Sequence, residues 1–144
     1  MQQFLKVVES AVLFLARVGF GALMFLHGWH RITQGSGEYV PALTAVGLPY
    51  PTVFFWGTVA LELGGGVLLA CGVLTRLVAA AFVAEFVMTI LWLHWWNGWD
   101  VMAGGFEYAG ILALLALVFV AFGGGIVAVD HLIFGRPKDD QLAA

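Results

Sequence analysis

The stretch VVESAVLFLARVGFGALMFLHG, residues 7–28, decides the fold class of this chain. About 20 apolar residues span the hydrocarbon core of a bilayer as a helix, and only Glu9 and Arg17 interrupt the apolar run here. Three further stretches of this kind follow at about residues 52–73, 76–96 and 105–126. Since the backbone in lipid must satisfy its own hydrogen bonds, we expect an all-α membrane protein, a bundle of four transmembrane helices in a single domain covering residues 1–144.

Composition and charge exclude several classes of protein. Hydrophobic residues make up 62% of the chain and charged residues 10%, whereas a soluble domain is about 45–50% apolar and about 25% charged. The net charge is -3 and the positive residues do not cluster, so we expect membrane lipid and no nucleic acid as a partner. Cys71 is the single cysteine, which excludes an intramolecular disulfide and a paired-cysteine redox site within this chain.

The distribution of positive charge predicts the orientation. Loops that stay in the cytoplasm carry an excess of Lys and Arg. Arg31 is the only such residue in the connections 29–51 and 97–104. Outside the apolar stretches, the other positive residues fall at the opposite ends: Lys6, Arg76, Arg136 and Lys138. We therefore expect a multi-pass membrane protein with both termini in the cytoplasm.

Ionisable side chains inside or at the ends of the apolar stretches are the best indication of a functional site. They are Arg17, His27, Glu62, Glu85, His94 and Glu107. A charged group at the centre of a bilayer costs about 2.5–3.5 kcal/mol on insertion scales, so such residues usually face the bundle interior. Counted from the expected helix ends, the arginine and two glutamates form a central layer. The two histidines and the remaining glutamate form an outer layer.

The central layer predicts a buried ion pair. Arg17 needs a carboxylate at its own depth, and both Glu62 and Glu85 qualify. Only one of the two can be neutralised by Arg17, so the other is expected to be uncharged, because a lone carboxylate is costly in hydrocarbon. Three interpretations stay open: a fixed pair that sets the register of two helices, a site that moves protons or binds a polar head group, or a position at the lipid-facing edge of the bundle.

The third apolar stretch carries two ionisable side chains that are expected to point in different directions. Glu85 and His94 are nine residues apart, which at about 100° per residue places them on opposite faces of a straight helix. Both can face the bundle interior only if the helix bends. One of them is therefore expected to face a lateral groove or a partner subunit.

Glycines near these polar residues are candidates for close helix packing, because small residues let helix backbones approach one another in a membrane. They are Gly28, Gly64, Gly65 and Gly66.

The histidines are candidate metal ligands, since three imidazoles could bind copper, zinc or haem iron. The three candidates are His27, His30 and His94. A histidine near the end of a span is more often an interfacial hydrogen-bonding residue, so we expect no metal site.

Short motifs along nearly the whole chain resemble one known family. They are RVG (17–19), FLHG (25–28), ELGGG (62–66), GVLTR (72–76) and GGFEY (104–108), together with His94 and Asp130. In this order they resemble the DoxX family of small four-helix membrane proteins. The residues that match the family signature are Arg17, His27, Gly28, Glu62, Gly65, Arg76, His94 and Glu107.

The resemblance implies a four-helix membrane fold and a link to redox chemistry. The family takes its name from the membrane subunit of an archaeal thiosulfate:quinone oxidoreductase. Relatives are linked to bacterial membrane oxidoreductase complexes in thiol and oxidative-stress defence, and more distant relatives resemble membrane chaperones or cargo receptors. This chain departs from the commonest pattern at His30, where lysine is more usual, and in its tryptophan-rich stretch 94–99.

These observations lead to one principal hypothesis. The resemblance leads us to expect a quinone-linked redox subunit of an oxidoreductase complex in a bacterial cytoplasmic (inner) membrane, with a pocket open to the outer leaflet. His27, His94 and Glu107 are the candidates to bind the quinone head group or to exchange its protons. The sequence has no motif for haem, flavin or an iron–sulfur cluster, so electrons would come from another protein or a small sulfur compound. Other subunits or a second copy of the chain are expected partners.

Two other functions fit the same residues. A non-catalytic scaffold, assembly factor or chaperone-like subunit would use the ion pair and the glycines only to hold a rigid bundle. A transporter of protons, metal ions or small solutes would need a polar path across both leaflets. The inner half of the apolar stretches lacks polar residues, which argues against transport.

Overall fold

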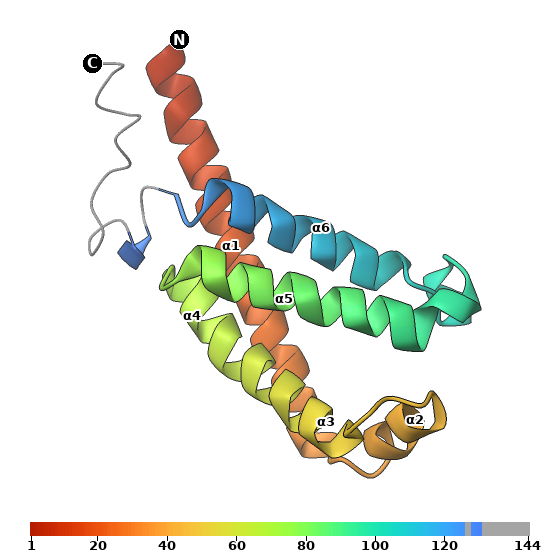
Figure 1. Cartoon of the computed structure of the whole chain (residues 1–144). Helices are drawn as coiled ribbons and strands as arrows, with labels where there is room; N and C mark the ends of the chain where they lie inside the picture. Colours follow the sequence, from red (N-terminus) through yellow and green to blue (C-terminus); the bar gives the residue numbers. More distant parts are fainter. Residues whose placement is uncertain (126–127, 131–144) are drawn as a thin grey trace.

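The computed structural model describes residues 1–125 and 128–130, and the regular elements of these residues are all helices (Figure 1). The first half of the chain starts with a long helix, α1 (Gln2–Gln34), and a short one, α2 (Tyr39–Ala45). One uninterrupted rod follows, made of α3 (Pro51–Ala60), the π-helical segment η1 (Leu61–Gly65) and α4 (Gly66–Cys71).

The second half is a helical hairpin. Its first arm is α5 (Thr75–Thr89), extended by the π-helical segment η2 (Ile90–His94) and the 3₁₀ turn η3 (Trp95–Asn97). A second 3₁₀ turn, η4 (Val101–Ala103), lies in the connection, and the returning arm is α6 (Glu107–Phe122). The all-helical fold class is thus confirmed for the described residues.

Three of these rods are long and apolar enough to cross a membrane: Phe4–Gln34, Pro51–Cys71 and Thr75–Asn97. The fourth, α6, has 16 residues and a length of about 24 Å, which is less than the roughly 30 Å of a hydrocarbon core. The structure therefore supports three to four apolar spans. The expected end of the fourth span, at residue 126, lies outside the described residues.

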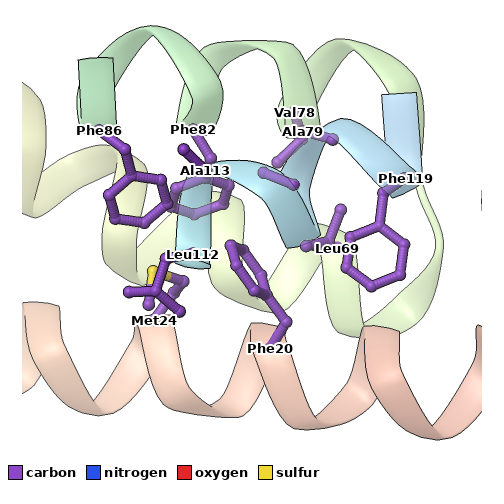
Figure 2. Packing of buried hydrophobic residues seen from close by; sticks show 11 residues of the cluster. Phe20, Met24, Leu69, Val78, Ala79, Phe82, Phe86, Leu112, Ala113 and Phe119 are labelled. Carbon is purple, nitrogen blue, oxygen red and sulfur yellow. The ribbon is translucent and has the colours of Figure 1, made fainter. Parts of the chain in front are cut away.

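The rods form two antiparallel pairs that cross one another (Figure 1). α1 packs along η1 and α4, and α5 packs along α6. The hydrophobic core lies at the crossing (Figure 2), where Phe20 of α1 meets the rings of Phe82 at 5.4 Å and Phe119 at 5.8 Å between centroids. Such edge-to-face pairs contribute about 0.5–1.5 kcal/mol beyond the area they bury. Apolar side chains therefore fill the middle of the bundle.

Two glycines fix the register between α1 and α4. A Cβ atom on Gly21 would lie 2.5 Å from the carbonyl oxygen of Gly66, and a Cβ on Gly66 would lie 2.7 Å from that of Gly21. Nearer the end of α1, a Cβ on Gly28 would lie 3.0 Å from the side chain of Glu62. The two backbones touch along this line, as small residues allow in membranes.

The other glycines of the ELGGG motif differ from one another. Gly65 faces inward, and a Cβ on it would lie 3.3 Å from the ring of Phe82. Gly64, expected to belong to the same packing set, is exposed and has no neighbour within 4 Å of such a Cβ. Consecutive residues of a helix point about 100° apart, so adjacent glycines cannot all face the same partner.

The turn between α4 and α5 is closed by Asp130. Its two carboxylate oxygens accept hydrogen bonds from the backbone N–H groups of Leu74 (2.6 Å) and Thr75 (2.7 Å). Burial alone would raise the pKa of the Asp130 carboxyl, but these hydrogen bonds and the positive charge of Arg17 outweigh it, so the pKa lies below its ordinary value. Asp130 thus caps the first turn of α5 from a segment more than fifty residues away.

Arg17 lies near this turn. The side chain is 1% exposed, and its guanidinium contacts Gly72, where no Cβ could be accommodated. We expect Arg17 to pair with Glu62 or Glu85, but in the structure Glu62 forms its ion pair with Arg31. The antiparallel register is the reason: it places Arg17 level with Gly72 and Gly28 level with Glu62.

Candidate functional site

A cavity of about 170 Å³ lies between the two helix pairs, near the end of α1. Its floor and walls include Met24, Phe86 and Leu112. Polar side chains from every long rod also line it: His27, Arg31, Glu62, Glu85, His94 and Tyr108. We call this space, defined by these six residues, the polar cavity.

Arg31 and Glu62 form the central ion pair of the polar cavity. Arg31 Nε lies 2.8 Å from Glu62 Oε2, and the glutamate side chain is only 3% exposed. The guanidinium also lies over the ring of Tyr39 in α2, 5.0 Å from its centroid, a cation–π contact. A helix in the connection between α1 and α3 thus holds the arginine over the cavity.

Glu85 brings a second carboxyl group into the same space. It is 8% exposed, and its Oε2 atom is buried without a hydrogen-bond partner among the described residues. Two charged side chains act on the Glu85 carboxylate: Glu62 repels it, and Arg31 attracts it. A buried polar atom of this kind is costly unless a ligand or water satisfies it.

His27 links α1 to α6. Its Nδ1 atom lies 2.9 Å from the carbonyl oxygen of Leu23, and its Nε2 atom lies 3.3 Å from the hydroxyl of Tyr108. The two rings stack at 6.0 Å between centroids. Since a carbonyl oxygen only accepts, Nδ1 carries the hydrogen, and in the neutral ring Nε2 accepts from the tyrosine.

His94 is held by the loop before α6. Its Nδ1 atom lies 2.6 Å from the carbonyl oxygen of Gly104, and the side-chain amide of Asn97 donates to the same oxygen at 3.2 Å. The same argument puts the hydrogen of the neutral ring on Nδ1. Nε2 is then an acceptor, and no hydrogen bond to it is present within residues 1–125 and 128–130.

The π-helical segment η2 explains how Glu85 and His94 share one cavity. In a straight α-helix they would point in opposite directions, and one was expected to face away from the bundle. A π-helical turn has i→i+5 hydrogen bonds and so winds through a smaller angle per residue. η2 (Ile90–His94) follows the part of α5 that carries Glu85 and ends at His94, and both side chains line the cavity. Glu62 lies in the other π-helical segment, η1.

Several residues expected in the site lie elsewhere. Glu107 begins α6 and is partly exposed, but it is not among the residues that line the polar cavity. His30 is exposed on α1. Within the part of the chain that the structure describes, no group of three or more His, Cys, Asp or Glu side chains could hold a metal ion.

Two residues of the cavity escaped sequence reasoning. The apolar pattern predicts that the first helix ends at Gly28, which places Arg31 in a loop. The helix in fact continues to Gln34 and ends before Gly35, whose φ of +77° suits glycine. Spacing could have found Arg31, since it follows His27 by four residues and so shares its face. Tyr108 lies in the GGFEY motif beside Glu107.

Comparison with known proteins identifies the family. The sequence profile of DoxX matches residues 12–95, more than half of the chain. The chain belongs to the DoxX family. The match includes His27, Glu62 and His94, and it leaves the Tyr108 side of the cavity outside.

Two curated relatives match nearly the whole chain. The Bacillus subtilis (strain 168) protein named "Putative oxidoreductase CatD" is 27% identical over 130 residues, which cover 90% of this chain and 92% of that protein. The Escherichia coli (strain K12) protein named "Inner membrane protein YqjF" is 28% identical over 136 residues, which cover 90% of this chain and 97% of that protein. No solved structure matches.

Proposed function

We propose that this DoxX protein is the quinone-binding membrane subunit of an oxidoreductase complex in a bacterial inner membrane. The polar cavity is the observation that carries the proposal. It combines apolar walls with hydrogen-bonding groups from all the long rods, as expected of a site for a small, mostly apolar ligand. The names of the two relatives, one an oxidoreductase and the other an inner membrane protein, support the same class and location.

The size of the cavity fits a single ring. An apolar cavity of about 150 Å³ admits benzene, and the polar cavity measures about 170 Å³. A quinone head group would therefore fill it, and the isoprenoid tail would remain outside, in lipid. A transporter is less well supported, because the core around Phe20, Phe82 and Phe119 closes the bundle between the cavity and the α4–α5 turn.

The side chains of the cavity supply binding and proton exchange. Reduction of a quinone to a quinol takes up two electrons and two protons. Glu85 and His94 lie in the cavity with unused hydrogen-bonding atoms, so they are the groups that could exchange protons with a bound ring. The electrons come, in this proposal, from another subunit or a small sulfur compound.

Binding of a short-tailed quinone to the purified chain in lipid nanodiscs tests the proposal. We expect saturable binding that Glu85→Met or His94→Asn weakens and that Glu107→Gln leaves unchanged, since Glu107 does not line the cavity. Membranes from a deletion strain should show altered quinol turnover. Absence of binding together with unchanged turnover would contradict the proposal and favour a non-catalytic scaffold.

A further inference from the structure

We propose that the polar cavity binds the reduced, hydroxyl-bearing form of a quinone-type ring more tightly than the oxidised form, with Glu85 and His94 accepting its hydrogen bonds. This inference rests on the proposed function and deepens it. Beyond binding a ring, the cavity would distinguish its two redox forms through the hydrogen-bonding groups that line it.

His94 supplies one of the two acceptors in the cavity. Its Nδ1–H group is committed to the carbonyl oxygen of Gly104 at 2.6 Å, so in the neutral ring Nε2 presents a lone pair and no hydrogen. No described residue donates to that lone pair. His94 therefore offers the cavity an acceptor, and a ligand group facing it must bring the hydrogen.

Glu85 supplies the other acceptor in the cavity. Its Oε2 atom is buried in the cavity wall without a partner among residues 1–125 and 128–130. An ionised carboxylate only accepts hydrogen bonds, whereas a neutral carboxyl both accepts and donates. In the first state Glu85 requires a donor, and in the second it is satisfied by either a donor or an acceptor. Neither state favours a ligand that only accepts.

The remaining groups do not reverse this preference. The hydroxyl hydrogen of Tyr108 is used on His27 Nε2 at 3.3 Å. Arg31 is a donor, and its Nε atom lies 2.8 Å from Glu62 Oε2 in the ion pair. Its other N–H groups can serve a carbonyl oxygen or a hydroxyl oxygen equally, because both have lone pairs. Arg31 thus helps to bind either form without choosing between them.

The two redox forms differ in hydrogens at both oxygens. A quinone presents two carbonyl acceptors, and facing His94 Nε2 it would set one lone pair against another. A quinol presents two hydroxyl groups that each donate and accept. Leaving a buried acceptor unsatisfied costs about 1–3 kcal/mol, so the cavity distinguishes the forms by at least one hydrogen bond.

The experiment compares three ligands with the same ring and short tail: the quinone, the quinol kept reduced under anaerobic conditions, and the dimethyl ether of the quinol. The ether keeps both ring oxygens but has no hydrogen to donate; because its two methyl groups make it larger than the quinol, the quinone serves as the control for size. With the full chain in nanodiscs, calorimetry should show the quinol binding about tenfold more tightly than the other two, a difference of about 1.4 kcal/mol.

Variants assign the preference to its residues. His94→Asn keeps a donor for the Gly104 carbonyl and removes the Nε2 acceptor, so the preference for quinol over the ether should fall about tenfold. Glu85→Met removes the second acceptor at similar length and should weaken quinol binding by a similar factor. Glu107→Gln is the matched control, because this carboxyl does not line the cavity. Helical circular dichroism of each variant verifies that it folds.

The possible outcomes separate the two proposals. If no ligand binds, the proposed function fails. If quinone or ether binds as tightly as quinol, or if the preference survives His94→Asn in a folded variant, this inference fails while quinone binding stands.

Discussion

At the scale of single residues, the ion pair between Arg31 and Glu62 is the interaction that organises the cavity. Glu62 is almost fully buried, and Arg31 is about three-quarters buried, at 24% side-chain exposure. Removing one partner of such a pair leaves an uncompensated charge, which costs more than the pair itself contributes. The two residues should therefore matter for stability before they matter for chemistry.

Arg31→Met should destabilise the chain by about 3 kcal/mol, the lower end of the range for breaking a buried pair. The lower end applies because the arginine is partly exposed. Denaturation in mixed micelles, followed by helical circular dichroism, measures the loss. The double variant Arg31→Met with Glu62→Leu should regain most of the stability, since neither charge is then left alone. Equal stability of wild type and Arg31→Met would rule out the role assigned to the pair.

Asp130 gives a prediction that depends on pH. Its folded pKa lies below its ordinary value of 3.8, so the charged form stabilises the fold above about pH 3.8 and this contribution is lost as the pH falls through the folded pKa. Asp130→Asn should cost about 1 kcal/mol near neutral pH, a value kept small because the carboxyl is partly exposed to solvent. The difference from wild type in thermal unfolding should shrink on acidification; a difference that grows below pH 3.8 would contradict the assignment.

At the scale of elements, close packing of α1 on α4 and the two π-helical segments determine the geometry. The backbone contact between Gly21 and Gly66 brings the antiparallel rods together. η1 carries Glu62, and η2 turns His94 toward the side of Glu85. π-helical turns occur frequently at functional sites, and both of those in the described residues border the polar cavity.

The glycines of the ELGGG motif provide a matched pair of variants. Gly66→Ala places a methyl group 2.7 Å from the carbonyl oxygen of Gly21, and overpacking of this kind costs about 1–3 kcal/mol. Gly64→Ala, two residues earlier, meets open space and should be neutral or stabilising by up to about 1 kcal/mol, because alanine favours helix. The same denaturation assay compares them. Equal effects of the two substitutions would contradict the packing described here.

At the scale of the whole molecule, the charged groups described above fall into two regions, and an aromatic core separates them. The polar cavity lies near the end of α1, and Arg17 with Asp130 lies at the α4–α5 turn. Between them, Phe82 and Phe119 are fully buried. Apolar side chains therefore separate the two polar regions inside the bundle.

The expected topology can be tested with cysteine labelling. Positive charge predicts cytoplasmic termini, so Ser36→Cys in the first connection should react with a membrane-impermeant maleimide added to intact spheroplasts, and Gln2→Cys should react only after lysis. Both substitutions are made in a Cys71→Ala background, because Cys71 is exposed. Labelling of Gln2→Cys in intact spheroplasts would show that the N-terminus lies outside the cytoplasm. The orientation would then be the reverse of the expected one, with the cavity on the cytoplasmic side.

The sequence by itself determined the class of this protein. Long apolar stretches and 10% charged residues require helices in a membrane, because lipid leaves no other way to satisfy the backbone. The cost of placing ionisable groups in hydrocarbon also made His27, Glu62, Glu85 and His94 conspicuous, and all four line the cavity. These conclusions depend only on composition and spacing.

The tertiary structure alone decided which of these groups meet. Glu62 pairs with Arg31 because α1 continues past Gly28 and because glycine contacts fix its register against α4. Glu85 and His94 face one cavity because η2 departs from α-helical winding. Neither the register between two helices nor a π-helical turn follows from local periodicity, since packing between distant segments selects both.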